Sequence, residues 1–390
     1  MPKQGLFHNV AYFDALLPQR NRSFSLDVLR GIAICGIVFL NAPFFINFDY
    51  GYVAIMPEVA TDSVLLSLQV LLLDGRFRGL FLVLFALGLV IQWQRIGAHT
   101  QPYHPLRARL CVLLILGCIH SFFIWAGDIL LGYALAGLIA ITMIEDSPRR
   151  QLINGMGCFA IGTILLLCLG WLSNEPLPTY SSPVYQQYLD DFNPNFLASR
   201  VDNAHNAVLM LIALLLGVLW LELGVILMTI SVWRSGWLVT PWPQKHKALI
   251  GFVCAVCLVV SAFKLTHASG LSDVGALIAN SMSGFLTALI VIHCVTFWPI
   301  NANKVTYAFA CVGKMSLSCY LGQSLIMVIL NHFHGEIFAR QFYLHDYLLL
   351  STVIMVFMLV FCPFYLRLFK QGPIEKVWRA LSLKYTLHNS

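Results

Sequence analysis

Long apolar runs constrain the fold of this chain more than any other feature of its sequence. A membrane-spanning helix needs about 20 predominantly apolar residues. Ten such stretches can be read along the chain, at 27–46, 77–94, 108–126, 129–145, 152–173, 205–232, 248–264, 275–298, 305–330 and 347–368. A soluble domain carries about 25% charged residues, whereas this chain of 390 residues has 11% charged and 59% hydrophobic residues. The sequence therefore predicts an all-α, polytopic membrane helix bundle of ten spans, with one transmembrane domain at 25–368.

Positive charges are distributed unevenly between alternate loops. If the N-terminus is cytoplasmic, the outer segments hold only five basic residues, namely Arg76, Arg78, Arg200, Lys264 and Arg340. Cytoplasmic loops of membrane proteins collect Lys and Arg, so we expect both termini in the cytoplasm, with a cytoplasmic segment at 1–24 and an interfacial segment at 369–390. The same rule explains the excess of 24 basic over 18 acidic residues without any nucleic acid. No small-residue cleavage site follows the first run, which predicts an uncleaved signal anchor.

Loop and cysteine patterns give weaker signals. The outer loop at 174–204 is rich in Pro, Ser, Asn and Asp, which predicts an irregular lid or binding element.

All eleven cysteines fall in apolar runs, where cysteine behaves as a small hydrophobe, so we expect no disulfides. Cys254 and Cys257 form a CxxC pair, and HFHGE at 332–336 has the two-His spacing of a metal site in a short outer loop. Neither has further ligands nearby, and we expect no metal.

Arg30 and Asn41 share one face of the first predicted helix. Eleven residues rotate an α-helix by about 1100°, which leaves the two side chains ~20° apart and about 16 Å apart along the axis. One interpretation is a snorkelling arginine and an amide contact between helices. The other is that the Arg30 guanidinium, near the cytoplasmic end, binds a phosphate or pyrophosphate.

An imidazole and a carboxylate interrupt the apolar sequence at His120 and Asp128. His120 lies about 18 Å into its helix, near the bilayer midplane, where the neutral imidazole is favoured. That form can act as a general base or carry an acyl group, although a hydrogen bond to a neighbouring helix also explains its position. Asp128 begins the next helix, where a carboxylate caps the free amides, and it could also orient His120 or an acceptor.

Further polar side chains lie in or beside the predicted spans. Asp74, Arg76 and Arg78 are expected on the outer side, where they either bind an anionic acceptor or head group, or form an Asp–Arg pair in a solvated turn. Glu222 lies deep in the sixth span and needs a partner, for which Lys314 is one candidate. The ninth span has a wet face, which must contact protein or a water-filled cavity: Ser316, Tyr320, Gln323 and Ser324.

Five sequence blocks, in order, resemble one family of bacterial membrane proteins. They are LDVLRGIAICGIVFLNA (26–42), FRGLFLVLFALGL (77–89), GCIHSFFIWAGDILLGYALAGL (117–138), CVGKMSLSCYLGQSL (311–325) and FKQGPIEKVWRALS (369–382). Together they are similar to the YeiB family, whose membrane domain is catalogued as domain of unknown function 418, and the resemblance runs from about residue 25 to residue 382. It implies a multi-pass protein of the bacterial inner (plasma) membrane.

A more distant similarity suggests a chemistry. The first span, RGIAICGIVFLN, resembles that of heparan-alpha-glucosaminide N-acetyltransferase and of the type 3 membrane acyltransferases. Those proteins move acyl groups from cytoplasmic coenzyme A to acceptors across the membrane. Type 3 acyltransferases usually have His at the position of Asn41, and asparagine cannot act as a general base. The resemblance therefore favours His120 as the base or acyl carrier, with Asn41 supporting the oxyanion.

We therefore expect a transmembrane acyltransferase that moves an acetyl or acyl group from cytoplasmic acyl-coenzyme A to a hydroxyl or amine on a sugar or envelope molecule reached from outside. Asp128 completes the expected catalytic set, and Arg30 and Lys314 are expected to bind acyl-coenzyme A. The expected acceptor-binding residues are Asp74, Arg76, Arg78, Glu222, Ser316, Tyr320 and Gln323. Expected partners are the lipid bilayer, acyl-coenzyme A and the acceptor, with self-association left open. The alternative is a small-molecule transporter or permease.

Overall fold

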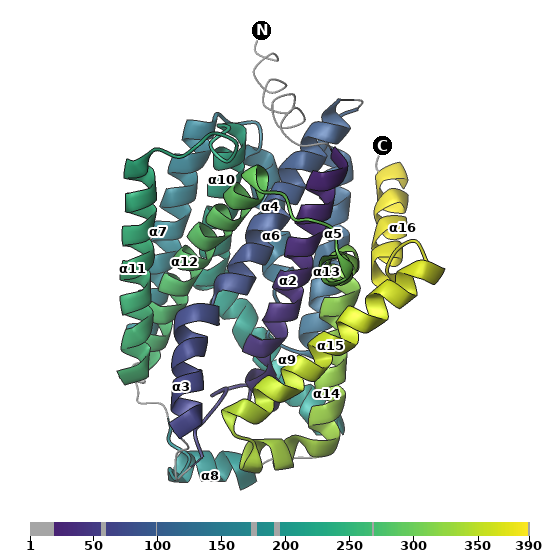
Figure 1. Ribbon diagram of the computed structural model, residues 1–390. Coiled ribbons are helices and arrows are strands. Elements are labelled where there is room, and N and C mark those ends of the chain that lie inside the picture. The colour runs from purple at the N-terminus through teal and green to yellow at the C-terminus, as the bar shows by residue number, and fades with distance from the viewer. Residues whose placement is uncertain are drawn as a thin grey trace.

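The computed structural model describes residues 19–55, 60–98, 100–172, 178–190, 196–266 and 269–388, and this part of the chain is all-helical (Figure 1). Most of the predicted segment at 1–24, parts of the outer loop (173–177 and 191–195) and the side chain of Lys264 lie outside the described residues. The α-helices are α2 (Gln19–Ile46), α3 (Ala60–Leu68), α4 (Arg76–Gly97), α5 (Tyr103–Ile119), α6 (Leu130–Ala140), α7 (Pro148–Leu172), α8 (Pro183–Asp190), α9 (Phe196–Ala213), α10 (Leu219–Arg234), α11 (Gln244–Thr266), α12 (Gly270–Phe297), α13 (Lys304–Lys314), α14 (Ser316–Gln341), α15 (Leu344–Leu368) and α16 (Pro373–His388). Three π-helical turns, η1 (Gln69–Leu73), η2 (His120–Ile124) and η4 (Leu214–Val218), and a 3₁₀ turn, η3 (Ile141–Met143), extend or join them.

Seven of the described helices are long and apolar enough to cross a membrane, or eight if the bent α13–α14 pair counts as one span. The sequence predicts ten. Seven predicted spans match these helices, and the span at 305–330 is the pair that bends by 84° at Met315. The run at 77–94 forms α4, which is not among the seven, and the run at 129–145 forms an apolar helix, Leu130–Met143, that is shorter than the about 20 residues a span needs.

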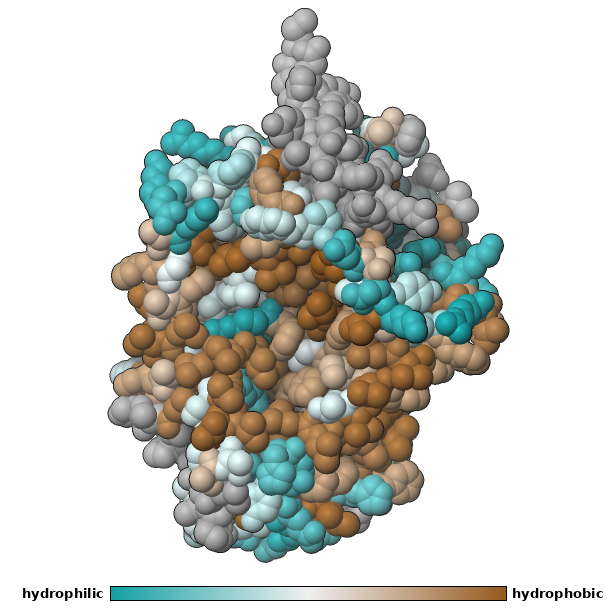
Figure 2. All heavy atoms as spheres, viewed as in Figure 1, coloured by the Kyte–Doolittle hydropathy of each residue, from teal (hydrophilic) through white to brown (hydrophobic). Residues whose placement is uncertain are grey.

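The outward-facing surface of the bundle is apolar. Leu172, Trp298 and Phe333 are each at least 70% exposed, and Figure 2 shows a broad hydrophobic band around the middle of the molecule with hydrophilic residues gathered towards both ends. A helix that is hydrophobic all round belongs inside a large core or in lipid. By helix composition, the chain is therefore a multi-pass membrane protein.

Glycines bring the central helices into backbone contact. A Cβ added at Gly31 on α2 would overlap the carbonyl oxygen of Phe309 on α13, and one added at Gly313 would overlap the carbonyl oxygen of Asp27. Without a hydrophobic driving force between helices in lipid, small residues at interfaces provide the close packing that holds the bundle together. α13 is thereby fixed across α2.

Breaks in the helices place polar residues inside the bundle instead of at its outer surface. Gly75 (φ 77°) precedes α4 and packs against Asn280 and Gly284, and Gly79 packs against Gly284, near the middle of the 28-residue α12. Arg76 and Arg78 therefore lie in the first turn of α4 and not in a solvated turn. Arg76 Nη1 donates to the backbone oxygen of Asp74 (2.5 Å) and to Asn280 Oδ1 (2.9 Å), and its guanidinium also interacts electrostatically with the Asp74 carboxylate.

The outer loop is more regular than its composition predicts. α8 forms within it, with Tyr185 and Leu189 buried. Asn47 Nδ2 at the end of α2 donates to the Tyr185 hydroxyl (3.2 Å), and Arg340 Nη2 on α14 contacts Asp190 Oδ1 at 2.9 Å. These contacts fix α8 across the end of the bundle opposite α16 (Figure 1).

The C-terminal helix is attached to the bundle by a buried carboxylate. Glu375 Oε1 accepts from the amides of Leu317 (2.8 Å) and Ser318 (3.0 Å), and Oε2 accepts from the Ser318 hydroxyl. Trp378 Nε1 donates to the backbone oxygen of Arg109 on α5 (2.9 Å). Glu375 therefore supplies the N-terminal cap that α14 needs after its 84° bend from α13.

Replacing Glu375 with alanine is expected to lower the free energy of unfolding by about 1–3 kcal/mol, because two buried helix amides lose their acceptor. The measurement is thermal unfolding of the purified protein in detergent. Lys376→Ala changes the neighbouring exposed residue and should unfold at the wild-type temperature. Equal unfolding temperatures for both variants would contradict the role of Glu375 as a cap.

Candidate functional site

The candidate site lies where α5 ends in the middle of the bundle. α5 passes into the η2 turn at His120, whose carbonyl oxygen accepts from the Trp125 amide (2.8 Å). Trp125 is extended (φ −154°, ψ 126°), and the chain continues without regular structure to α6. π-helical turns are rare and frequently mark functional sites.

Two side chains of α9 stabilise this break by pairing its backbone. Asn203 Oδ1 accepts from the Ala126 amide (2.9 Å), and Asn203 Nδ2 donates to the carbonyl oxygens of Ser121 (3.0 Å) and Phe122 (3.1 Å). Arg200 Nη1 donates to the carbonyl oxygen of Ile124 (2.6 Å). Non-helical backbone inside a membrane protein needs such partners, because no lipid group can replace them.

His120, Asp128 and Tyr320 form a buried cluster at this break. His120 Nδ1 lies 2.7 Å from Asp128 Oδ1, and the two side chains are 0% and 1% exposed. Tyr320 is fully buried, its ring centroid lies 5.0 Å from that of His120, and its hydroxyl donates to Asp128 Oδ1 (3.3 Å). Asp128 Oδ2 accepts from the Leu131 amide (2.6 Å). Asp128 thus both caps α6 and contacts His120.

The second nitrogen of His120 has no hydrogen-bond partner among the described residues. The two nitrogens lie on different edges of the ring, so Nε2 points away from Asp128. When one nitrogen faces a carboxylate, the other is free to exchange a proton. The geometry therefore leaves Nε2 as the ring nitrogen that does not face Asp128.

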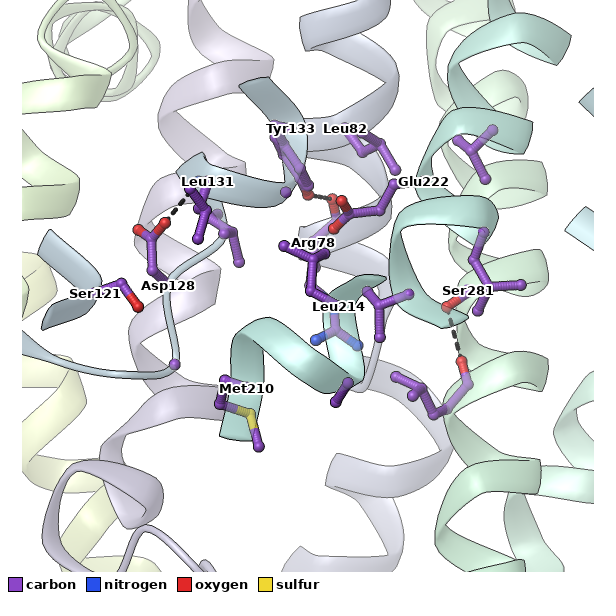
Figure 3. Close-up of a pocket in the computed structure, with 18 of the residues that line it drawn as sticks. Arg78, Leu82, Ser121, Asp128, Leu131, Tyr133, Met210, Leu214, Glu222 and Ser281 are labelled. Carbon is purple, nitrogen blue, oxygen red and sulfur yellow. Dashed lines mark hydrogen bonds between the residues drawn. The ribbon is translucent and has the colours of Figure 1, made fainter. Parts of the chain in front are cut away.

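A cavity of about 270 Å³ lies beside this cluster (Figure 3). Its walls include Ser121 and Asp128 from the break, Arg78 from α4, Tyr133 from α6 and Glu222 from α10. The Tyr133 hydroxyl donates to the carbonyl oxygen of Arg78 (3.0 Å), which joins α6 to α4. His120 is not among the lining residues, but its contact partner Asp128 is.

The structure places the other predicted residues in three groups. Arg30 Nη1 contacts Asp27 Oδ1 at 3.2 Å, and the exposed Lys314 also interacts electrostatically with Asp27. Asn41 is half-buried on α2 and is not among the cavity-lining residues. The pairing of Glu222 with Lys314 is wrong, because Glu222 interacts with Arg78 and Asp128 instead.

The polar face of α14 points into protein. Tyr320, Gln323 and Ser324 are each at most 2% exposed, whereas Ser316 is partly exposed. The Ser324 hydroxyl donates to the Tyr320 carbonyl oxygen (3.1 Å), and Gln323 Oε1 has no partner among the described residues. This confirms that the wet face contacts the bundle interior and not lipid.

Metal-ligating residue types do not gather in the described part of the chain. No group of three or more His, Cys, Asp and Glu side chains there could hold a metal. Residues 332–336 lie within α14 and not in a loop, which corrects the sequence interpretation. All eleven cysteines are free thiols, and Cys319 and Cys362 approach to 3.3 Å between sulfur atoms.

Sequence reasoning missed a second His–Asp contact at the start of α15. Asp62 on α3 is buried, accepts from the Tyr52 hydroxyl (2.6 Å) and the Leu344 amide (2.7 Å), and lies 3.0 Å from His345 Nδ1. Burial raises the pKa of Asp62, but the hydrogen bonds from Tyr52, His345 and Leu344 outweigh it and hold the pKa below its usual value. Asp62 therefore links α3 to the N-terminus of α15.

Comparisons with known proteins relate the chain to two bacterial proteins and to one family model. A family model described as "Protein of unknown function (DUF418)" matches residues 232–385. The chain is 31% identical over 389 residues to the "Uncharacterized protein YeiB" of Escherichia coli (strain K12), covering 93% of this chain and 97% of that protein. It is 23% identical over 383 residues to the "Uncharacterized protein YxaH" of Bacillus subtilis (strain 168), covering 91% and 92%.

Proposed function

The chain belongs to the DUF418 family, and we propose that it is a transmembrane acyltransferase. It would transfer an acetyl or acyl group from cytoplasmic acyl-coenzyme A to a hydroxyl or amine of an acceptor reached from the outer side. The observation that carries the proposal is the buried His120–Asp128 contact in a broken helix, which leaves Nε2 without a partner. An Asp-oriented imidazole with one free nitrogen is the arrangement that general-base catalysis of acyl transfer uses.

In the proposed step, His120 Nε2 takes the proton from the acceptor hydroxyl or amine. The acceptor oxygen or nitrogen attacks the thioester carbonyl, the C–S bond breaks, and the proton passes to the departing coenzyme A sulfur. Asp128 holds the ring and stabilises the imidazolium, while the Tyr320 hydroxyl supports the carboxylate. Because the His120 side chain is 0% exposed, substrates reach Nε2 only when the side chains packed against the η2 turn move.

The membrane orientation follows from where the basic residues lie. The start of α2 and all of α16 are at the same end of the bundle (Figure 1). Arg95 and Arg234 lie in the last turns of α4 and α10, and Arg149 and Arg150 in the first turn of α7, and these turns lie at that same end. Under the positive-inside rule this end is cytoplasmic. The ten proposed passes are the seven long helices, the α13–α14 pair, α4 and the shorter α6.

Donor binding is proposed at Arg30 and Lys314. α2 and α13 pack in backbone contact through Gly31 and Gly313, and this contact brings both cations beside Asp27. Arg30 is about one-third exposed and Lys314 is exposed, so both are accessible to the phosphates of coenzyme A. A forked guanidinium suits such groups.

Acetyl-coenzyme A is expected to raise the unfolding temperature of the purified protein, because a ligand that binds only the folded state adds about 2.7 kcal/mol at 100 times its Kd. Arg30→Gln and Lys314→Gln should reduce the rise, whereas Lys304→Gln, an exposed cation at the start of α13, should retain it. Incubation with an envelope extract should also release coenzyme A thiol. If acetyl-coenzyme A and free coenzyme A both leave the unfolding temperature unchanged, the enzyme proposal fails.

A transporter is the second candidate, and the helix breaks favour it. The η1, η2 and η4 turns and the α13–α14 bend interrupt four helical segments, and transporters build substrate sites from discontinuous helices near the midplane. Transport predicts counterflow of substrate in liposomes with no covalent change. Acyl transfer predicts a product that is heavier by the acyl group.

A further inference from the structure

The cavity beside Asp128 contains a guanidinium and a carboxyl group that do not pair with each other. Arg78 and Glu222 both line it, from α4 and α10, and Figure 3 shows the Arg78 side chain extending away from the Glu222 carboxyl group. Within the described residues no ion pair joins them within 4 Å, although they interact electrostatically over a longer distance. The Arg78 guanidinium and the Glu222 carboxyl group are therefore not in direct contact.

Each of these groups also lacks another partner. No hydrogen bond of the Arg78 guanidinium is found among the described residues, and the side chain is exposed. Glu222 Oε2 is buried without a hydrogen-bond partner, and it packs where a side chain on Gly132 would overlap it. A polar or ionisable group without a partner at membrane depth is costly unless water or a ligand compensates it.

The position of the cavity within the bundle favours a ligand as the partner of these groups. Arg78 is one residue from Gly79, which packs against Gly284 in the middle of α12. The wall formed by α9 and η4 is apolar, with Met210 and Leu214 lining the cavity. The Arg78 guanidinium therefore borders an otherwise apolar space, where an anionic group of a ligand would compensate its charge.

We propose that this cavity binds a small hydroxyl- or amine-bearing oxyanion, with the phosphate or carboxylate group on Arg78 and the hydroxyl or ammonium group donating to Glu222. A guanidinium binds such oxyanions with two parallel hydrogen bonds, and a carboxylate accepts from hydroxyl or ammonium donors. The volume of about 270 Å³ is below the usual 300–1,000 Å³ range of ligand pockets. The ligand is therefore a small molecule or the head group of a lipid. It is the acyl acceptor only if the proposed function holds.

The test measures binding to the full chain without any acyl donor. In neutral detergent, sn-glycerol 3-phosphate should raise the unfolding temperature, whereas glycerol should not. Arg78→Gln should weaken this binding at least about tenfold, the effect of losing a charge-assisted contact. Arg95→Gln removes an exposed arginine from the other end of α4 and should bind as wild type. Glu222→Gln should weaken glycerol 3-phosphate but not inorganic phosphate, which has no alcohol group.

A second arm identifies the source of the ligand. In nanodiscs of phosphatidylcholine with or without phosphatidylglycerol, native mass spectrometry would show whether a phosphatidylglycerol molecule stays bound and is lost in Arg78→Gln. If Arg78-dependent binding is seen with glycerol 3-phosphate in detergent, the ligand is a free oxyanion. If it is seen with phosphatidylglycerol in nanodiscs, the ligand is a lipid head group. Arg78→Lys keeps the charge and should retain part of the binding, which separates loss of charge from loss of fold.

Absence of binding in both arms, or equal binding by wild type and Arg78→Gln, would overturn the inference. The outcome is independent of the acyl-transfer assay. Arg78-dependent binding without any release of coenzyme A would leave the cavity assignment standing and reject the proposed enzyme. Acyl transfer with no Arg78-dependent binding would support the proposed enzyme and reject the cavity assignment.

Discussion

His120→Ala is expected to lower the rate of acyl transfer by about 100- to 10,000-fold, which is the range that a positioned general base contributes. The ring is the only group of the cluster with a basic nitrogen, and its Nε2 has no partner in the described structure. The rate of coenzyme A release in the presence of the acceptor checks this. Because the donor is proposed to bind at Arg30 and Lys314 and not at His120, donor binding in the thermal-shift assay should remain.

Two further variants separate catalysis from folding. His120→Gln keeps an amide that can donate to Asp128 but has no basic nitrogen, so it should be as inactive as His120→Ala while unfolding closer to wild type. His104→Ala removes an exposed histidine at the start of the same helix and should be fully active. An active His120→Gln enzyme would exclude His120 as the base.

Hydropathy predicts the helices well because the hydrophobicity of a helix is a property of its own residues and not of its neighbours. A run of about 20 apolar residues is hydrophobic wherever the chain takes it, and the runs at 152–173 and 347–368 correspond to α7 and α15. The same property cannot distinguish a span from a short helix enclosed by others. The run at 129–145 is apolar because α6 is surrounded by α4, α5 and α10, and its length is set by the break before it.

The candidate site was only partly predictable. Spacing along one helix places Arg30 and Asn41 on one face, but it does not show which helices meet. His120 and Asp128 are eight residues apart and come together because Asn203 and Arg200 on α9 hold the break open. Neither Asn203 nor Arg200 stands out in the sequence, since each is an ordinary polar residue shortly before an apolar run.

The partner of Glu222 shows the same limit. Charge alone suggested Lys314, yet α13 bends away from α14 and carries Lys314 to the Asp27 side of α2. Arg78 reaches Glu222's cavity because Gly75 and Gly79 let α4 approach α12. A signal was present in the sequence as DGRFRG, in which glycines separate charged residues, but it indicates a close approach without naming the helix approached.

Gly313→Ala is expected to lower the free energy of unfolding by at least about 3 kcal/mol, the upper part of the usual range for overpacking. The new Cβ would overlap the Asp27 carbonyl oxygen, and a backbone atom of a packed helix cannot turn aside as a side chain can. α13 must therefore move away from α2, which also separates Lys314 from Arg30. Thermal unfolding in detergent measures the loss of stability, and the unfolding temperature should fall. The rise in unfolding temperature that acetyl-coenzyme A causes measures donor binding, and this rise should also become smaller.

Gly157 is a matched control, at which alanine is expected to have the opposite effect on stability. A Cβ added at Gly157 on α7 would have no atom within 4 Å, and alanine in a helix interior is more favourable than glycine by about 0.5–1 kcal/mol. Gly157→Ala should therefore unfold at or slightly above the wild-type temperature, with donor binding unchanged. If Gly313→Ala behaved like Gly157→Ala, α13 would not lie in backbone contact with α2, and the proposed donor site at Arg30 and Lys314 would lose its structural basis.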